Sequence, residues 1–135
     1  MDQNRPNVQS QITFLYYRDL EPAAGFYQKT MGLELVEDQG WAKIYRVSGN
    51  AFLGIVDEKR GLCKAQAKNA VVVTFAVPDV FWWYEYLRRQ GVKLLTEVQE
   101  SKEIQVRGFF AEDPGGYTIE IQRFLEPETA RIFHS

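Results

Sequence analysis

The clearest alternation of apolar and polar positions lies near the carboxyl end, on both sides of a short turn. An apolar run ends in the sequence Asp-Pro-Gly-Gly at 113–116, and alternation resumes over 117–122. Proline fixes φ in a turn, glycine accepts a positive φ, and a period of two marks a half-buried strand, so the pattern predicts a β-hairpin. The second strand carries Glu120 on the face opposite Ile119 and Ile121. A charge there requires water, a partner or a pocket.

The first half of the chain has a strand pattern, a helix pattern and three more strand patterns. The run 11–17 is rich in β-branched and aromatic residues and predicts a strand. Asp19 can cap the following helix, whose apolar stripe runs to Met31 and which is expected to end at Gly32. Further strands are predicted over 33–37, 41–47 and 51–56.

The same order of elements returns after a polar connection. Asp79, which is expected to cap a second helix ending at Gly91, lies 60 residues after Asp19. The strands predicted around this helix cover 70–77, 92–98, 103–111 and 117–124. Such an internal repeat predicts one α+β domain built from two βαβββ modules, whose curved mixed sheet surrounds a cavity. The modules span about 10–68 and about 69–124, and the tail over 125–135 can form a short helix.

Composition narrows the functional classes. The 135 residues are 45% hydrophobic and 25% charged, as in a globular protein. Sixteen Lys and Arg against eighteen Asp and Glu leave no basic stripe, so we expect no nucleic-acid partner. The first residues lack the apolar core of a signal peptide and no apolar run could span a membrane, so we expect a cytoplasmic protein without a membrane partner.

Cysteine and histidine occur once each, at Cys63 and His134. One chain therefore cannot assemble the usual zinc sets of these residues. We expect Cys63 to be a small buried or half-buried residue, and His134 to be a solvated residue of the tail.

Three stretches of the chain carry an ordered set of motifs. They read Leu15-x-Tyr17-x-Asp19-Leu20 with Gly25-Phe26-Tyr27-x-x-x-Met31-Gly32-Leu33, then Phe75-x-Val77-x-Asp79-Val80 with Gly91-Val92, then Phe110-x-x-Asp113-Pro114-Gly115-Gly116-x-x-Ile119-Glu120-Ile121. In this order they resemble the vicinal oxygen chelate superfamily, which includes glyoxalase I, bleomycin-resistance proteins, fosfomycin-resistance transferases and extradiol dioxygenases. The resemblance covers the chain except its first eight residues and the tail. It implies the paired-module fold rather than one activity, because this fold hosts many chemistries.

In metal-dependent members, the resemblance implies four ligand positions, one on the first and one on the last strand of each module. Transferred to this chain, they fall at Ile12, about Gly54, Val72 and Glu120. Only Glu120 can bind an ion, and one carboxylate with water is a poor divalent site. Gln11, the nearest alternative, should face away from Ile12 because side chains alternate along a strand. We therefore expect no metal and no other cofactor.

The predicted cavity wall follows from the period of two. If Ile12, Val72 and Glu120 share an inner face, that face also holds other residues of the same three strands. The candidate ligand-binding residues are Phe14, Tyr16, Thr74, Thr118 and Gln122, together with Arg107 and Trp41. Apolar walls with a few polar groups are typical of small-molecule pockets. The alternative is an ordinary core, with Glu120 paired to Arg107 or Lys43.

The second predicted helix begins with four aromatic residues, Phe81-Trp82-Trp83-Tyr84. Successive helix positions turn by about 100°, so they cannot all face the sheet. Trp83 and Tyr84 share the core stripe with Leu87, which leaves Phe81 or Trp82 partly exposed. An exposed aromatic residue there is typical of a subunit contact, and we expect a homodimer.

Two functions are compatible with these residues. The first is a metal-independent binding protein resembling the bleomycin-resistance branch, with aromatic walls around a planar, often cationic small-molecule ligand and Glu120 as counter-charge. The second is a lyase or isomerase of glyoxalase type with Glu120 as the catalytic base, for which Arg107, Lys43 or Tyr16 would have to supply the electrophile. A dimeric scaffold or regulatory partner is a third possibility.

Overall fold

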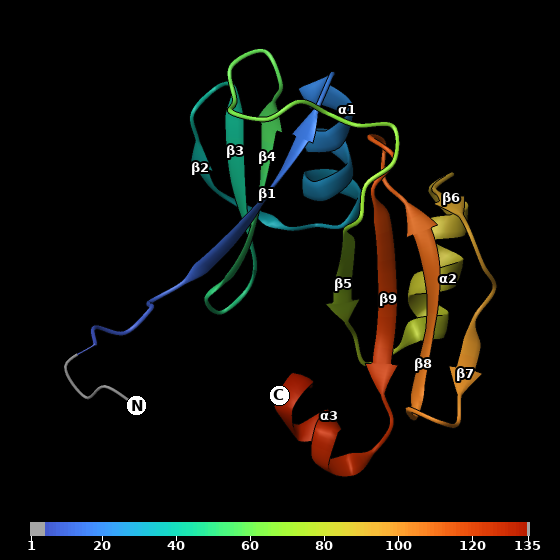
Figure 1. The fold of residues 1–135 in the computed structure, drawn as a ribbon. Coiled ribbons are helices and arrows are strands. Elements are labelled where there is room, and N and C mark those ends of the chain that lie inside the picture. The colour runs from blue at the N-terminus through green and yellow to red at the C-terminus, as the bar shows by residue number, and fades with distance from the viewer. Residues whose placement is uncertain (1–4, 135) are drawn as a thin grey trace. The chain divides into compact units, whose positions relative to one another are not determined.

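The computed structural model describes residues 5–134, which form two compact units (Figure 1). The first unit ends at Ala65 and the second begins at Gln66. Each unit contains one mixed sheet and a helical segment between its first and second strands. The α+β class and the two βαβββ modules predicted from the repeat are thereby confirmed.

The first unit has a four-stranded sheet in the order β1-β4-β3-β2. Its elements are β1 (Gln11–Tyr17), α1 (Leu20–Gly25), the π-helix η1 (Phe26–Thr30), β2 (Glu34–Asp38), β3 (Ala42–Ser48) and β4 (Ala51–Asp57). β1 runs parallel to β4, whereas β3 is antiparallel to both of its neighbours. The helical segment stops before Gly32, whose φ of 71° suits glycine and closes the helix as predicted.

The second unit repeats this plan with a sheet in the order β5-β9-β8-β6, and β7 also pairs with β8. Its elements are β5 (Val72–Ala76), α2 (Val80–Arg89), β6 (Lys93–Leu94), β7 (Gln99–Ser101), β8 (Val106–Glu112), β9 (Thr118–Phe124) and α3 (Pro127–Phe133). β5 runs parallel to β9 and β8 is antiparallel to it. Figure 1 shows α2 on one face of β8 and β9, and α3 beyond the carboxyl end of β9.

Aspartate side chains fix the turns at equivalent places in both units. Asp19 Oδ1 accepts a hydrogen bond from the Glu21 N–H at 3.3 Å, and Asp79 Oδ1 accepts one from the Trp82 N–H at 3.0 Å. Each carboxylate thus satisfies a backbone donor that the first helical turn leaves free. In the β8–β9 hairpin, Asp113 Oδ1 accepts hydrogen bonds from two backbone N–H groups of the turn.

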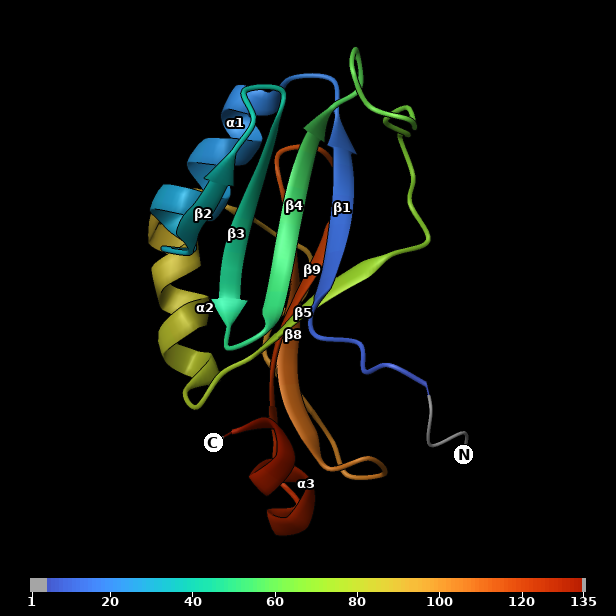
Figure 2. The ribbon, with the colours of Figure 1, turned by 90° about the vertical axis from the view of Figure 1, so that its left-hand side faces the viewer.

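Each core lies between a sheet and its helical segment. In the first unit, the helical segment lies along one face of the sheet (Figure 2). Tyr27 of η1 is fully buried, and its ring lies 6.4 Å from that of Tyr45 on β3. In the second unit, the Tyr84 ring of α2 meets the Phe109 ring of β8 edge-on at 5.1 Å. The buried residues of the two sheets are Leu15, Tyr17, Tyr45, Leu53 and Ile55 in the first, and Phe109, Ala111, Ile119 and Ile121 in the second.

The amino end of α2 presents aromatic side chains, as the pattern predicted. Trp83 and Tyr84 are half-buried, whereas Phe81 and Trp82 are 57% and 51% exposed. The Trp82 ring stacks on that of Tyr86 at 4.9 Å. The exposure is confirmed, and a role in a subunit contact stays a prediction.

Three sequence-based expectations were wrong. The strand predicted over 92–98 forms only at Lys93–Leu94, and a separate short strand, β7, follows it. The next predicted strand begins at Val106 rather than at 103, because the chain turns at Gln105, whose φ is 52°. Cys63 is exposed, since it lies in the irregular connection after β4. His134 is half-buried and hydrogen-bonded, as described below.

Candidate functional site

The candidate site is the face of the second sheet that lies opposite α2. Its residues follow from the register, because Thr118, Glu120 and Gln122 of β9 alternate with the buried Ile119 and Ile121. The parallel neighbour β5 adds Val72, Thr74 and Ala76, which pair with 118, 120 and 122 in that order. All three β5 residues are exposed, whereas the β9 residues are half-buried. Within the second unit, these residues of β5 and β9 therefore lie on one face of the sheet.

Glu120 stands in the middle of this face. Its Oε1 accepts a hydrogen bond from Thr74 Oγ1 at 2.8 Å, and Phe110 of β8 lies directly opposite it in the ladder. A carboxylate can accept several hydrogen bonds, so the bond from Thr74 orients the group and leaves acceptor capacity for a ligand. The site thus offers a fixed negative charge between a hydroxyl group and an aromatic ring.

Gly108 lies on β8 where that strand comes very close to β9, beside Gln122. The two residues pair across β8 and β9, and a Cβ atom on Gly108 would come within 2.6 Å of the Ile121 carbonyl oxygen and 3.0 Å of Gln122 Cβ. Two strands can approach this closely only where one lacks a side chain.

The C-terminal helix packs at one end of the same face. Phe124, which shares the face with Glu120 and Gln122, stacks on Phe133 of α3 at 4.5 Å. At the start of α3, hydrogen bonds from the backbone N–H groups of Thr129 and then Glu128 hold the pKa of the Glu126 carboxyl below its ordinary value. The first turn of α3 is therefore capped by Glu126, and Phe133 packs the helix against β9.

His134 secures this arrangement. Its ring Nε2 accepts a hydrogen bond from the Phe124 backbone N–H at 3.0 Å, and the His134 backbone N–H donates to the Ala130 carbonyl oxygen. No pattern in the sequence indicated this role, because a single histidine at the end of a chain is usually solvated. The alternation that places Phe124 at the end of β9 was the nearest indication that something packs there.

The first unit presents an equivalent face with different chemistry. Phe14 of β1 pairs with Gly54 of β4, and its ring covers Gly54 so closely that no Cβ atom would fit. Tyr16 lies on the same face and packs near Gly61 in the same manner. Trp41, another of the predicted site residues, directly precedes β3. The Arg60 guanidinium lies 5.6 Å from the centre of the Trp41 ring. This face is aromatic and carries no counterpart of the pair formed by Thr74 and Glu120.

Two residues proposed as neighbours of Glu120 are engaged elsewhere. Arg107 alternates with Phe110 along β8 and therefore faces α2, where its guanidinium lies 5.4 Å from the Phe81 ring. It forms a salt bridge with Glu100 at 2.6 Å. Lys43 of the first unit forms a salt bridge with Asp38 at 2.9 Å. The alternative in which Arg107 neutralises Glu120 is therefore wrong, whereas the pairing of Lys43 with Glu120 stays a prediction.

The family model of the Glyoxalase/Bleomycin resistance protein/Dioxygenase superfamily matches residues 9–121. The chain belongs to this superfamily. Bacillus subtilis (strain 168) has a relative, the uncharacterized protein YraH, that is 27% identical over 121 residues; the match covers 82% of this chain and 94% of that protein.

Solved structures of the superfamily share the fold. A glyoxalase/bleomycin resistance protein/dioxygenase from Nocardioides is 19% identical with a TM-score of 0.69, covering 92% of this chain and 88% of that one. Lactoylglutathione lyase from Agrobacterium tumefaciens is 20% identical with a TM-score of 0.68, covering 88% of this chain and 96% of that one. At these identities the likeness establishes the glyoxalase-like fold and leaves the reaction open. Within residues 5–134, no helix is long and apolar enough to cross a membrane.

The residues at the superfamily's metal positions do not fit a divalent ion. Side chains at Ile12 and Val72 are hydrocarbons, Gly54 has none, and Glu120 supplies a single carboxylate. Ca²⁺ and Mg²⁺ need several oxygen ligands, and catalytic zinc takes three protein ligands. No group of three or more His, Cys, Asp or Glu side chains placed to hold a metal occurs in the described part of the chain. The chemistry available on this face therefore comes from Glu120 and its protein neighbours.

Proposed function

We propose that this glyoxalase-like protein is a metal-independent binding protein for a small planar molecule that carries a positive charge. The observation that carries the proposal is the Glu120 carboxylate, held by Thr74 at 2.8 Å on a sheet face and flanked by Phe110. A planar cation would gain both the charge of Glu120 and contact with the aromatic ring. An attraction of this kind is stronger in a half-buried site than in water.

Catalysis of glyoxalase type receives less support from the same residues. Such a reaction requires a group that stabilises negative charge on the substrate beside the base. Arg107, the candidate on the neighbouring strand, faces α2 and is bound to Glu100. The pair formed by Thr74 and Glu120 can therefore orient a ligand, and the face gives the proposed base no arginine partner.

Proflavine, a planar aromatic cation, is a suitable probe. Fluorescence anisotropy should show saturable binding, and Glu120→Gln should weaken it about tenfold or more, because a hydrogen bond to a charged group contributes about 1.5–3 kcal/mol. Glu103→Gln is the matched control, since Glu103 is exposed in the turn before β8 and the substitution makes the same change in net charge. Equal losses in both variants would mean that general attraction, not the site, binds the probe.

The same proteins test the metal-independent part of the proposal. Calorimetric titration with Ni²⁺, Zn²⁺ and Mn²⁺ should give no tight binding with one ion per chain. Tight binding that Glu120→Gln abolishes would refute metal independence, and would show that Glu120 gains ligands that the described residues do not supply. Proflavine binding that is insensitive to Glu120→Gln would refute the assignment of the site.

A further inference from the structure

The first unit contains a polar pocket that is separate from the Glu120 face. It has a volume of about 590 Å³, within the range of small-molecule sites. Six charged residues line it, namely Arg18, Asp19, Glu21, Lys43, Asp57 and Lys59. They come from the turn after β1, the first turn of α1, the start of β3 and the end of β4. Lys43 and Asp57 point to the α1 side of the first sheet, because they align with the buried Ile55 and Tyr17.

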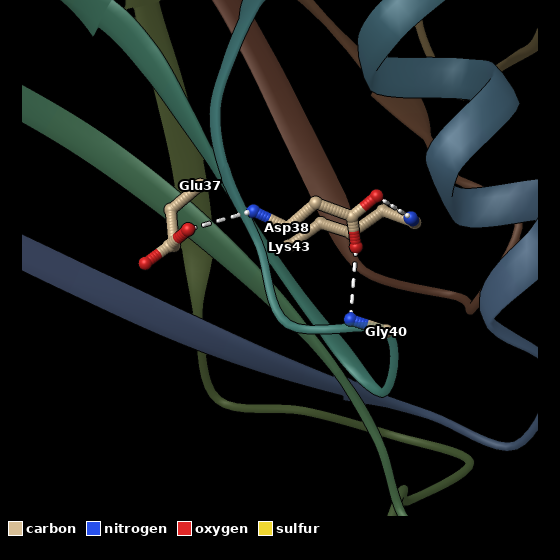
Figure 3. Close-up of polar contacts among 4 residues, drawn as sticks. All are labelled: Glu37, Asp38, Gly40 and Lys43. Atoms are coloured by element: carbon tan, nitrogen blue, oxygen red, sulfur yellow. Dashed lines mark hydrogen bonds and ion pairs between the residues drawn. The ribbon is translucent and has the colours of Figure 1, made fainter.

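Lys43 is held in place at one wall of this pocket. Its Nζ donates to Asp38 Oδ2 at 2.9 Å, while Asp38 Oδ1 accepts from the Gly40 N–H at 2.9 Å (Figure 3). The hydrogen bond from Lys43, followed by that from Gly40, holds the pKa of the Asp38 carboxyl below its ordinary value. An ammonium group has three N–H donors, so the bond to Asp38 leaves two of them for a ligand.

Two of the three lining carboxylates are already used by the backbone. Asp57 Oδ1 accepts from the Lys59 N–H at 2.9 Å, and Asp19 Oδ1 accepts from the Glu21 N–H at 3.3 Å. These bonds fix the turns that shape the pocket. The carboxylates of Asp57 and Asp19 therefore have fewer free acceptor positions for a ligand.

The remaining charged groups have no partner within residues 5–134. The Arg18 guanidinium, the Lys59 ammonium and the Glu21 carboxylate form no hydrogen bond or ion pair there. Arg18, Lys59 and the two remaining N–H donors of Lys43 can donate hydrogen bonds to an anionic group of a ligand. The Glu21 carboxylate can accept them from a cationic group. A simple anion would leave the Glu21 carboxylate without a positively charged partner. It would also be repelled by that carboxylate, because like charges that share a site repel.

We infer that this pocket binds a small zwitterion of the α-amino acid type. The ligand carboxylate lies among Arg18, Lys43 and Lys59, where guanidinium and ammonium groups form charge-assisted hydrogen bonds. The ligand ammonium faces Glu21. The three positive and three negative side chains of the lining cancel, which matches a ligand without net charge.

Chemical-shift titration of the ¹⁵N-labelled full chain tests this inference, with L-alanine as the probe. The amide signals of Glu21, Gly40 and Lys59 report on the pocket walls and should shift in a saturable way. Acetate and ethylamine each supply one half of the ligand charge, and each should need at least tenfold higher concentration. Saturation by acetate at the concentration that suffices for L-alanine would overturn the zwitterion assignment, and no saturable shift with L-alanine would overturn the site.

Variants locate the site and separate it from the Glu120 face. Arg18→Gln and Lys59→Gln should each weaken L-alanine binding about tenfold or more, as expected for a lost hydrogen bond to a charged group. Lys29→Gln, on the exposed side of η1, is the matched control and should leave the affinity unchanged. Glu120→Gln should also leave it unchanged, so failure here and failure of the proflavine experiment are distinguishable. Equal weakening by the Lys29 control would attribute binding to net charge and overturn the inference.

Discussion

Tyr45→Phe is expected to stabilise the protein, because the hydroxyl it removes is buried without a partner. Tyr45 is 0% exposed, and its hydroxyl oxygen forms no hydrogen bond with any residue in the described range. Burial, and to a lesser degree the negative charge of Asp38, raises the pKa of this hydroxyl above its ordinary value. The ring itself packs near Tyr27 and would stay in place in the variant.

The magnitude follows from the cost of an unsatisfied polar group. A buried donor or acceptor without a partner costs about 1–3 kcal/mol, whereas a phenyl ring in the same place carries no such cost. Tyr45→Phe should therefore raise the free energy of unfolding by about 1 kcal/mol or more. For a chain of this length, 1 kcal/mol corresponds to a rise of about 4 °C in the melting temperature.

Tyr27→Phe is the matched control, since it removes the same atom from the same cluster. Tyr27 is also 0% exposed, but its hydroxyl receives a hydrogen bond from Tyr17 Oη at 3.4 Å. Its removal should lower the free energy of unfolding by about 1 kcal/mol. Urea unfolding followed by circular dichroism measures both variants. If Tyr45→Phe destabilises the protein as much as Tyr27→Phe, the Tyr45 hydroxyl has a partner and the reasoning is wrong.

Two further predictions concern the sheet face and the pocket. Gly108→Ala should lower the melting temperature, because the new Cβ would lie 2.6 Å from a backbone oxygen. Gly25→Ala should raise it, because the new Cβ would meet no atom within 4 Å and alanine favours a helix over glycine. Equal shifts in the two variants would contradict this reasoning. Folding favours the ionised form of Asp38, because the hydrogen bond from Lys43 and then that from Gly40 hold the pKa of its carboxyl below its ordinary value. Its contribution to stability is full at neutral pH and is lost as the pH falls through the folded pKa. The melting-temperature difference between wild type and Asp38→Asn should therefore shrink from pH 7 to about pH 3, and a constant difference would refute this.

The fold was predictable because local signals agreed with one another along the chain. Asp19 and Asp79 mark the starts of both helices, and both accept a hydrogen bond from a backbone N–H in the first turn. The Asp-Pro-Gly-Gly turn and the alternation after it fixed the β8–β9 hairpin, and thereby the face on which Glu120 lies. Where periodicity and turn residues give the same answer, one sequence suffices to assign an element.

The errors lie where local pattern and long-range pairing diverge. The pattern over 92–98 predicted one strand there, but pairing with β8 occurs in two short pieces, β6 at Lys93–Leu94 and β7 at Gln99–Ser101. A partner strand distant in sequence decides how much of such a segment is paired. His134 and the pocket around Lys43 were missed for a related reason, since their contacts join residues that no periodic pattern connects.

The two units show how one repeated module acquires two chemistries. Thr74 lies 60 residues after Phe14, and each residue pairs with the last strand of its own unit, Thr74 with Glu120 and Phe14 with Gly54. In the first unit an aromatic ring fills the space above a glycine, whereas in the second a hydroxyl orients a carboxylate. The strand pair is parallel in both units, so at these positions the difference in chemistry arises from the side chains. A polar ligand group is therefore expected at the second position, and an apolar surface at the first.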